Sequence, residues 1–536
     1  MTQHTGLRGI PSRNPSLTES LAVDQNRALI RFVRTVGERV WVRGAGILCL
    51  ALVLLTVAMP RKTSLPYDWV GAVTVTVVIL AAAIISAGIP AVRRFLNARS
   101  TPWLVGSLGV LAAIAVGYGS YYNTTWDSKL VELISQRPGS DATKYWQEYM
   151  SRYPNNDVLL ALMRGVEAAR HYIGVSFSTG ILIVNTAAFA LTITGVYMLA
   201  RMLISRSAGV IGMMLAIVLL GFSPWMAVPY TDVPVMWVPV WAIVIIARCR
   251  TASRITSIAL PAFGAGVIIA VGYCMKVTPI VGLPAAVLWA AWCAWSHRTE
   301  YSRPALCCWI VVVGLFLGTA GGLVLTKQLV SISADRPKIT PGVSASPWTY
   351  IAAGLRGQDD RYGVRVYGGY DHEVNASTWG KSTQDQTSRS KKIITEELSR
   401  RGIAKTAWFE VNKLDYNWGD GMFYAYGEGT DQSQQAVHKD AWSQWVSSWN
   451  NPNGDHYSLR ATWTQGIWWL ALIMCGGWLL RGRATPEMIL LIFTILGIAA
   501  FTLLFQGRSR YLIGHVPVIL AMAGGGFTYL RASEQE

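Results

Sequence analysis

Long apolar runs, separated by short basic loops, dominate the pattern of hydrophobic and polar positions along this chain. An α-helix needs roughly 20 residues to cross a bilayer, and most of the runs are close to that length. The pattern therefore predicts an all-α polytopic membrane protein. We expect about twelve transmembrane helices, at residues 44–59, 69–92, 102–121, 172–203, 208–228, 233–247, 255–275, 280–295, 305–325, 463–480, 488–505 and 512–530.

Two polar segments, at residues 122–171 and 326–462, interrupt the apolar runs. Connections this long are uncommon in compact proteins and are usually functional, and the second is long enough for a small folded domain. We expect four parts: a cytoplasmic basic segment, an N-terminal transmembrane module that includes the first polar segment, an extracytoplasmic domain and a C-terminal transmembrane module. Their boundaries are 1–43, 44–325, 326–462 and 463–536.

Three further local patterns predict structure outside the membrane. Residues 1–26 are rich in Ser, Thr, Gly and Pro, which predicts disorder, and residues 27–43 have the spacing of a basic amphipathic helix. The apolar spacing of residues 388–402 predicts a surface helix that Gly402 ends.

The composition supports a membrane protein and explains the charge. Hydrophobic residues fill 52% of the 536 positions, and the formal net charge is +17. The excess of Lys and Arg lies in short loops, where it orients the chain and binds anionic lipid, so we expect no nucleic-acid partner. All seven Cys lie in or beside apolar runs, so we expect neither a disulfide framework nor a zinc site.

The arginines of the short loops predict the orientation of the chain. If the N-terminus is inside, five basic loops fall on one side, which the positive-inside rule identifies as cytoplasmic. Both termini are then cytoplasmic, and both polar segments lie outside, with Arg61 and Lys62 as an exception. The five loops carry Arg93, Arg94 and Arg99; Arg201 and Arg206; Arg248, Arg250 and Arg254; Arg298 and Arg303; and Arg481 and Arg483.

Asp127 is the leading candidate for a catalytic base. It lies just past the outer end of the third predicted span, where a base can meet a lipid headgroup. Partial burial against Trp126 and Tyr122 would raise the pKa of its carboxyl towards the working pH. The alternative is an ordinary solvated loop carboxylate. The other acidic candidates in the same segment are Glu132, Asp141 and Asp157.

Two neighbouring outer elements offer substrate-binding groups. Tyr230 and Asp232 lie in VPYTDVP, between prolines that stiffen the loop, and the aspartate can bind a sugar hydroxyl or hold the base in place. The alternative role for Asp232 is to cap the following helix. Lys276, in the apolar run GYCMKVTPI, is suited to an anionic lipid phosphate, although it can also snorkel to the interface without a specific partner.

Two further motifs lie in the C-terminal half of the chain. Arg508 and Arg510, in QGRSRYL, can grip a phosphate bidentately and neutralise a leaving group, whereas general anchoring to lipid headgroups is the alternative. Trp418 and Asp420 lie in NWGDGMF, in which Gly-Asp-Gly predicts a tight turn. An indole beside a carboxylate can hold a sugar, and a purely structural turn is the alternative.

Several motifs of other chemistries are absent from the sequence. It has no Walker A loop, no dinucleotide fingerprint, no HExxH motif, no nucleophile elbow and no DxD metal pair. Nucleotide-driven transport and cytoplasmic nucleotide-sugar chemistry therefore have little support, and we expect no metal and no cofactor.

Short motifs follow one another from about residue 123 to the C-terminus. They are WDSKLV, RYPNN, PYTD, GYCMKVTPI, the positions Gly354, Gly369 and Asp371, KLDYNWGDGMF and GRSRYLI. In this order they resemble the GT-C superfamily of polyprenyl-phosphate-sugar-dependent glycosyltransferases, which includes the protein O-mannosyltransferases, and most of all its branch in Gram-positive bacteria. In many members the acidic loop follows the first span, whereas here it follows the third, which two additional N-terminal spans would explain.

The resemblance implies a GT-C-like fold and an inverting displacement at an anomeric carbon. It places Asp127 in the role of the base, with a lipid phosphate leaving near Lys276, Arg508 or Arg510. The partners it implies are a polyprenyl-phosphate sugar donor, a glycan, lipid or protein acceptor, and membrane lipid. Some relatives use a divalent metal, for which this sequence has no paired-acid motif.

Four functions remain to be compared at this point. The leading hypothesis is sugar transfer to an acceptor outside the cytoplasm, and a polysaccharide polymerase or ligase would share its lipid-phosphate leaving group. A transporter of lipid-linked glycans would favour charges at the membrane midplane and broken internal repeats, whereas these charges gather at the outer face. A structural scaffold would have no need for converging outer loops.

Overall fold

The computed structural model is predominantly helical. It describes residues 17–60, 67–120, 127–249, 254–296, 303–332, 335, 337–359, 364–423, 438–482 and 485–529. In the first half of the chain the elements are α1 (Leu17–Ala58), α2 (Trp69–Gly88), α3 (Pro90–Asn97), α4 (Thr101–Ser120), α5 (Asp127–Ser135), η1 (Gly139–Asp141), α6 (Lys144–Arg152), α7 (Asn156–Ile173), α8 (Phe177–Leu203), α9 (Arg206–Ala216), the π-helical turn η2 (Ile217–Gly221), η3 (Pro224–Ala227), α10 (Trp237–Cys249) and α11 (Thr256–Met275).

The second half adds more helices and one small hairpin. Its elements are η4 (Thr278–Val281), α12 (Gly282–Ser296), α13 (Arg303–Ile332), α14 (Pro347–Gly354), β1 (Gly357–Asp359), β2 (Arg365–Tyr367), α15 (His372–Thr378), α16 (Thr383–Trp418), α17 (Ala441–Asn450), α18 (Tyr457–Arg481), α19 (Pro486–Leu504), η5 (Ser509–Leu512) and α20 (Val516–Tyr529). The two strands pair antiparallel, with Gln358 opposite Val366.

Eight helices within the described residues are long and apolar enough to cross a membrane. All twelve predicted runs are helical, but three of them form shorter apolar helices, and α18 carries the polar residues Arg460 and Gln465. The prediction of a helical membrane protein is therefore confirmed at the level of the bundle. The eight are Thr35–Ala58, Trp69–Gly88, Thr101–Ser120, Phe177–Leu203, Thr256–Met275, Thr278–Trp295, Leu306–Ile332 and Pro486–Leu504.

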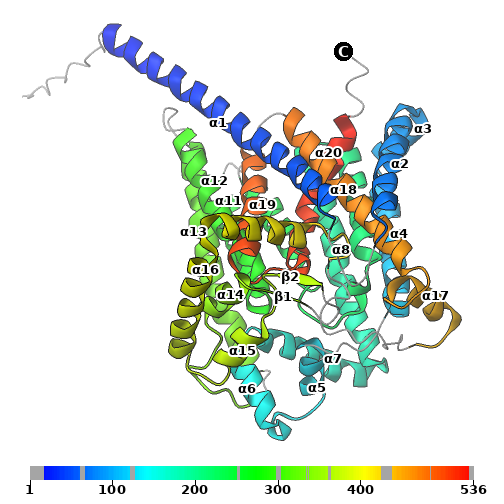
Figure 1. Cartoon of the computed structure of the whole chain (residues 1–536). Helices are drawn as coiled ribbons and strands as arrows, with labels where there is room; N and C mark the ends of the chain where they lie inside the picture. The colour runs from blue at the N-terminus through cyan, green and yellow to red at the C-terminus, as the bar shows by residue number, and fades with distance from the viewer. Residues whose placement is uncertain are drawn as a thin grey trace, which may run out of the picture.

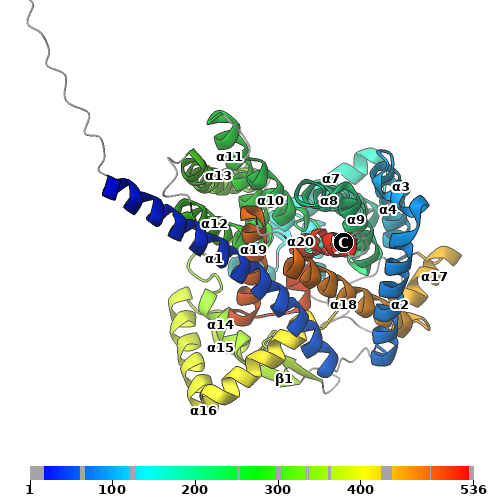
Figure 2. The same ribbon diagram turned by 90° about the horizontal axis from the view of Figure 1, so that it is seen from above.

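The first helix differs from the prediction. α1 runs without a break for 42 residues, so the basic segment and the first span form one helix, and Leu17 to Asn26 are helical rather than disordered. In Figure 1 its N-terminal half projects away from the bundle, and in Figure 2 it crosses over the ends of other helices. Its C-terminal half packs against α18, where a Cβ on Gly46 would lie 2.9 Å from the carbonyl oxygen of Gly476.

The two polar segments come together at one end of the bundle. Figure 1 shows α5, α6 and α7 from the first segment beside α15 from the second. The predicted surface helix is present within α16, and its predicted end is confirmed, since Gly402 breaks the helix with a φ of 67° and a ψ of 177°. That left-handed φ favours glycine over any residue with a side chain.

Arg152 fastens the two polar segments together. Its guanidinium donates to the Thr378 carbonyl oxygen at 3.0 Å, the Thr378 hydroxyl at 2.8 Å and the Gln386 side chain at 3.3 Å, and it lies over the Trp379 ring at 5.3 Å. The side chain is buried, so all of these partners would lose a donor if it were removed.

Replacing Arg152 by Ala should lower the free energy of unfolding by about 2–4 kcal/mol, because several buried acceptors would be left without a donor. Thermal unfolding in detergent would measure the change. The matched control is Lys144→Ala on the same helix, whose exposed ammonium lies 3.9 Å from Glu148 and should matter by less than about 0.5 kcal/mol. Equal effects of the two substitutions would contradict this role of Arg152.

Candidate functional site

Five segments that are distant in sequence converge beside the helices of the two polar segments. Five of the eight predicted site residues lie in this cluster, together with tyrosines that the sequence did not single out. The start of α5 contributes Asp127, and α6 contributes Tyr149. The loop before α10 carries Tyr230 and Asp232, and Lys276 follows the end of α11. The short helix η5 carries Arg510 and Tyr511.

A buried ion pair forms the deepest part of this cluster. Lys276, which follows the last residue of α11, donates to the Asp232 carboxylate, and both side chains are at most 8% exposed. The same ammonium lies 3.4 Å from the Arg510 carbonyl oxygen and 5.3 Å from the centre of the Tyr511 ring. Burial lowers the pKa of Lys276, and the charge of Asp232 opposes that shift. The predicted phosphate-binding lysine therefore already has a carboxylate partner.

Arg510 is the cation that connects the two carboxylates. Its guanidinium lies 5.4 Å from the centre of the Tyr230 ring and 5.5 Å from that of Tyr511. Burial alone would lower its pKa, but the interactions with Tyr511, Asp232, Tyr230 and Asp127 outweigh burial and raise it. The side chain is thus a permanent cation that interacts electrostatically with both Asp127 and Asp232.

Asp127 opens α5 and faces a group of tyrosines. The Tyr149 hydroxyl donates a hydrogen bond to the Asp127 carboxylate, and the side-chain amide of Asn156 donates to the same hydroxyl at 2.8 Å. Burial and then the charge of Asp127 raise the pKa of Tyr149 and of Tyr230 well above the ordinary value. Asp127 itself is exposed. It is therefore both oriented and reachable, as a general base must be.

The acidic alternatives to Asp127 do not join the cluster. Trp126 and Tyr122, which were expected to desolvate it, are outside the described residues. Glu132 is buried in an ion pair with Lys129 at 2.9 Å, and Asp141 is exposed in η1. Neither is an electrostatic neighbour of Arg510, unlike Asp127.

Arg508 is separated from the ion pair by the turn that begins η5. It is 2% exposed, and a Cβ on Gly369 would lie 3.3 Å from its guanidinium. The adjacent Gly507 amide donates to the Gly368 carbonyl oxygen at 2.8 Å. The predicted motif glycines therefore let the second polar segment approach Arg508 closely.

Trp418 and Asp420 occupy the predicted tight turn, but their surroundings favour its structural role. Trp418 is 3% exposed and stacked against Trp468 at 6.4 Å, so it offers no open ring face to a sugar. Asp420 accepts from the Ser509 hydroxyl at 2.6 Å and from the Met422 amide at 3.0 Å. This turn thus positions the segment that carries Arg508 and Arg510.

Lys413 supports the same segment, although no pattern in the sequence predicts a role for this side chain. Its fully buried ammonium donates to three carbonyl oxygens, those of Gly354 at 2.7 Å, Leu503 at 2.5 Å and Phe505 at 2.9 Å. Gly354 ends α14, and the other two lie at the end of α19, where unpaired carbonyls carry partial negative charge. Burial lowers the pKa of Lys413 to about 8, and the charge of Glu410 opposes the shift.

The stability of the protein should rise between about pH 8 and pH 10.5 because of Lys413. In that window the unfolded chain, with its ordinary pKa of 10.5, holds a proton that the folded chain has lost, so the free energy of unfolding increases with pH. The full contribution is about 3 kcal/mol. Thermal unfolding from pH 7.5 to 10 should show this rise in the wild type and lose it in Lys413→Met.

The control for that prediction is Lys405→Met, which removes an exposed lysine from the same helix. This variant should keep the wild-type pH dependence, because its side chain lies in water in both states. An identical slope in the wild type and in Lys413→Met would show that the buried ammonium does not titrate in this range.

Tyr149 and His515 are also residues that the sequence did not reveal. Tyr149 is one of several aromatic residues in KYWQEYM, and only its hydrogen bond to Asp127 distinguishes it. His515 is fully buried, and Lys276 is its electrostatic neighbour.

The described residues contain no group of three His, Cys, Asp or Glu side chains suited to a metal ion. Within the cluster the two carboxylates are those of Asp127 and Asp232, and the second is already paired with Lys276. These donors do not form a ligand set for the divalent cation that some GT-C members use.

Comparison with known proteins gives a family and a distant structural likeness. A search among curated proteins gave no match. The chain is similar to the Archaeoglobus fulgidus oligosaccharyltransferase tethered to an acceptor peptide with the NVT sequon, at 10% identity and a TM-score of 0.38, over 80% of this chain and 50% of that one. It is also similar to the archaeal oligosaccharyltransferase AglB from Archaeoglobus fulgidus in complex with an inhibitory peptide and a dolichol-phosphate, at 10% identity and a TM-score of 0.36, over 79% and 50%.

This chain therefore spans about half the length of those solved structures. The model of one protein family, described as conserved hypothetical integral membrane protein, matches residues 55–528. That match covers most of the sequence, including every segment of the cluster around Lys276 and Asp232. The chain belongs to this family of integral membrane proteins.

Proposed function

We propose that the protein is a membrane glycosyltransferase that moves a sugar from a polyprenyl-phosphate donor to an acceptor outside the cytoplasm. The observation that carries the proposal is the meeting of an exposed, oriented carboxylate with cations from distant segments. Asp127 is hydrogen-bonded to Tyr149, and it is an electrostatic neighbour of Arg510, which lies beside the Lys276–Asp232 pair.

In this mechanism Asp127 takes the proton of an acceptor hydroxyl as its oxygen attacks the anomeric carbon. The bond between that carbon and the phosphate oxygen breaks, and the electron pair leaves with the lipid phosphate. Attack from the face opposite the leaving group inverts the configuration of the anomeric carbon. The proton ends on Asp127, and solvent recovers it because this side chain is exposed.

The cations match the charge that this reaction develops. A sugar phosphodiester carries one negative charge, whereas the departing monoester gains a second one as the bond breaks. Lys276 is buried and Arg510 is partly buried, and in such a setting a cation stabilises developing charge more strongly than it does in water. Asp232 keeps Lys276 in place and shares its charge, so Arg510 is the principal phosphate ligand in the proposal.

The orientation predicted from the sequence supports the same location of the chemistry. The positive-inside rule assigns the loops that carry Asp127 and Arg510 to the side opposite the predicted cytoplasmic arginine loops. A polyprenyl-phosphate sugar reaches this side embedded in the bilayer and needs no soluble nucleotide. The proposal places the active site outside the cytoplasm and both termini inside.

The test is turnover by the purified full-length protein in nanodiscs with a panel of labelled polyprenyl-phosphate sugars. We expect at least one donor to be consumed with release of the polyprenyl phosphate, and the anomeric configuration of the product to be inverted. Water or a simple sugar serves as the acceptor in a first screen. Intact donor that accumulates on the opposite side of sealed vesicles would instead identify a transporter.

A further inference from the structure

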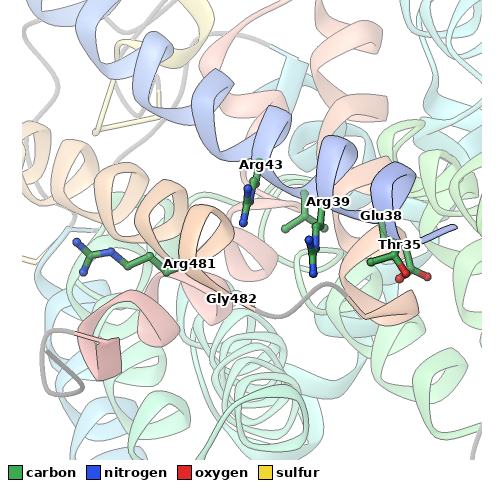
Figure 3. Close-up of a pocket in the computed structure, with 7 residues that line it drawn as sticks. Thr35, Glu38, Arg39, Arg43, Arg481 and Gly482 are labelled. Atoms are coloured by element: carbon green, nitrogen blue, oxygen red, sulfur yellow. The ribbon is translucent and has the colours of Figure 1, made fainter. Parts of the chain in front are cut away.

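A polar cavity lies far from the cluster around Lys276, between the first helix and the end of α18 (Figure 3). Its volume is about 410 Å³. α18 runs from the region of Arg460, which donates to the Phe222 carbonyl oxygen near the loop of Tyr230, to its last residue Arg481. At 1.5 Å per residue these two arginines are roughly 30 Å apart along the helix axis. The cavity is lined by Thr35, Glu38, Arg39, Val42, Arg43, Arg481 and Gly482.

The packing of α1 explains why a cavity forms here. α1 and α18 are in closest contact at Gly46 and Gly476, where neither helix has a side chain to separate the backbones. On its other side α1 rests on α12, since a Cβ on Gly37 would lie 2.5 Å from the Trp292 ring. These two contacts fix the position of the intervening segment of α1 relative to the end of α18. Val42 in this segment is buried and lines the cavity.

The lining of the cavity is strongly basic. Figure 3 shows Arg39 and Arg43 projecting from the same face of α1, with Arg481 at the end of α18. None of these three guanidinium groups forms an ion pair with any residue in the described ranges, whereas Glu38 is buried at the edge of the cavity. Three arginines against one glutamate leave an excess of positive charge, which an anion of matching size would neutralise.

The surroundings of the cavity are those of a lipid rather than a soluble anion. Next to the basic face, α1 exposes a row of large apolar side chains, and Trp41 among them is of the type that lies at membrane interfaces. The exposed fractions are 64% for Val40, 42% for Trp41, 59% for Ile47 and 57% for Leu48. A charged headgroup site that continues into an exposed apolar helix face has the shape of a phospholipid.

We propose that this cavity binds the phosphate headgroup of an anionic phospholipid, whose acyl chains lie along the apolar face of α1. Arg39, Arg43 and Arg481 hold the phosphate, and the bound lipid fixes the long first helix against α18. The cavity shares its side of the membrane with the predicted cytoplasmic arginines, where anionic lipids attract basic groups. This inference is independent of the proposed transferase activity, because the two sites lie at opposite ends of α18.

The test is binding of short-chain phosphatidylglycerol to the full-length protein in neutral detergent, followed by native mass spectrometry. Three samples are compared: the wild type, the double variant Arg39→Gln/Arg43→Gln, and the control Arg94→Gln/Arg99→Gln, which removes two exposed arginines from the same predicted side. We expect the first double substitution to weaken binding roughly tenfold and the control to leave it unchanged. Phosphatidylcholine of the same chain length should bind more weakly to the wild type.

Substitute variants and a competition with inorganic phosphate complete the experiment. If the double variant has a lower melting temperature, two other variants replace it in the binding measurement. Arg481→Gln should lose affinity for phosphatidylglycerol. The charge-retaining Arg39→Lys/Arg43→Lys should retain most of that affinity. Inorganic phosphate at millimolar concentration should displace the lipid poorly. Equal binding of inorganic phosphate and phosphatidylglycerol would overturn the lipid assignment, and an equal loss in the Arg94/Arg99 control would overturn the site.

Discussion

Asp127→Asn should lower the rate of sugar transfer by roughly 10²–10⁴-fold while leaving the affinity for the lipid-linked donor nearly unchanged. The amide has almost the same size as the carboxylate and can still accept the hydrogen bond from Tyr149, so the local structure should persist. It cannot take a proton from an acceptor hydroxyl. Single-turnover kinetics and a separate donor-binding measurement on the same preparation would distinguish the loss of a base from the loss of binding.

Two other variants provide a comparison for the activity of Asp127→Asn. Tyr149→Phe removes the hydroxyl that orients Asp127 and should cost less than the loss of the carboxylate itself, with an altered pH profile because the base loses a hydrogen bond. Asp141→Asn changes an exposed carboxylate of the same polar segment and should keep wild-type activity. Full activity in Asp127→Asn would exclude this side chain as the base, whatever the other variants do.

The parts of the fold that could be predicted from the sequence are those governed by local pattern. A run of some 20 apolar residues has few alternatives to a transmembrane helix, because backbone groups in lipid must be satisfied within the segment. The helix break at Gly402 and the turn at Asp420 follow from similarly local rules. The continuity of α1 through its basic segment was missed because nothing in a local pattern distinguishes one long helix from two.

The residues that hold the candidate site together could not be found in this way. Lys413 lies 59 positions from Gly354 and 90 from Leu503, and no spacing rule connects them. The local pattern of Trp418 and Asp420 fits a sugar-binding pair and a structural turn equally, and only the fold reveals that Trp468 stacks on the Trp418 ring. The pairing of Lys276 with Asp232 likewise depends on how α11 packs near the loop before α10.

The double variant Asp232→Asn/Lys276→Met should fold yet transfer sugar roughly 10²-fold more slowly than the wild type, if Lys276 contacts the leaving phosphate. Each single substitution should cost more stability than the pair together. Lys276→Met leaves the carboxylate of Asp232 buried with no ammonium beside it, which costs about 3–5 kcal/mol, whereas removing both charges avoids that penalty. Thermal unfolding of the four proteins in this cycle would measure the coupling.

Activity measured on the same four proteins separates catalysis from architecture. If the ion pair only joined α11 to the loop before α10, the double variant would recover activity together with stability, because its packing is restored. The Lys129–Glu132 pair on α5 is the control, since Lys129 is partly exposed and the pair lies within one helix turn. Replacing that pair by Met and Gln should change neither stability nor turnover by much. A stable double variant that turns over donor at the wild-type rate would remove Lys276 from the mechanism and leave Arg510 as the phosphate ligand.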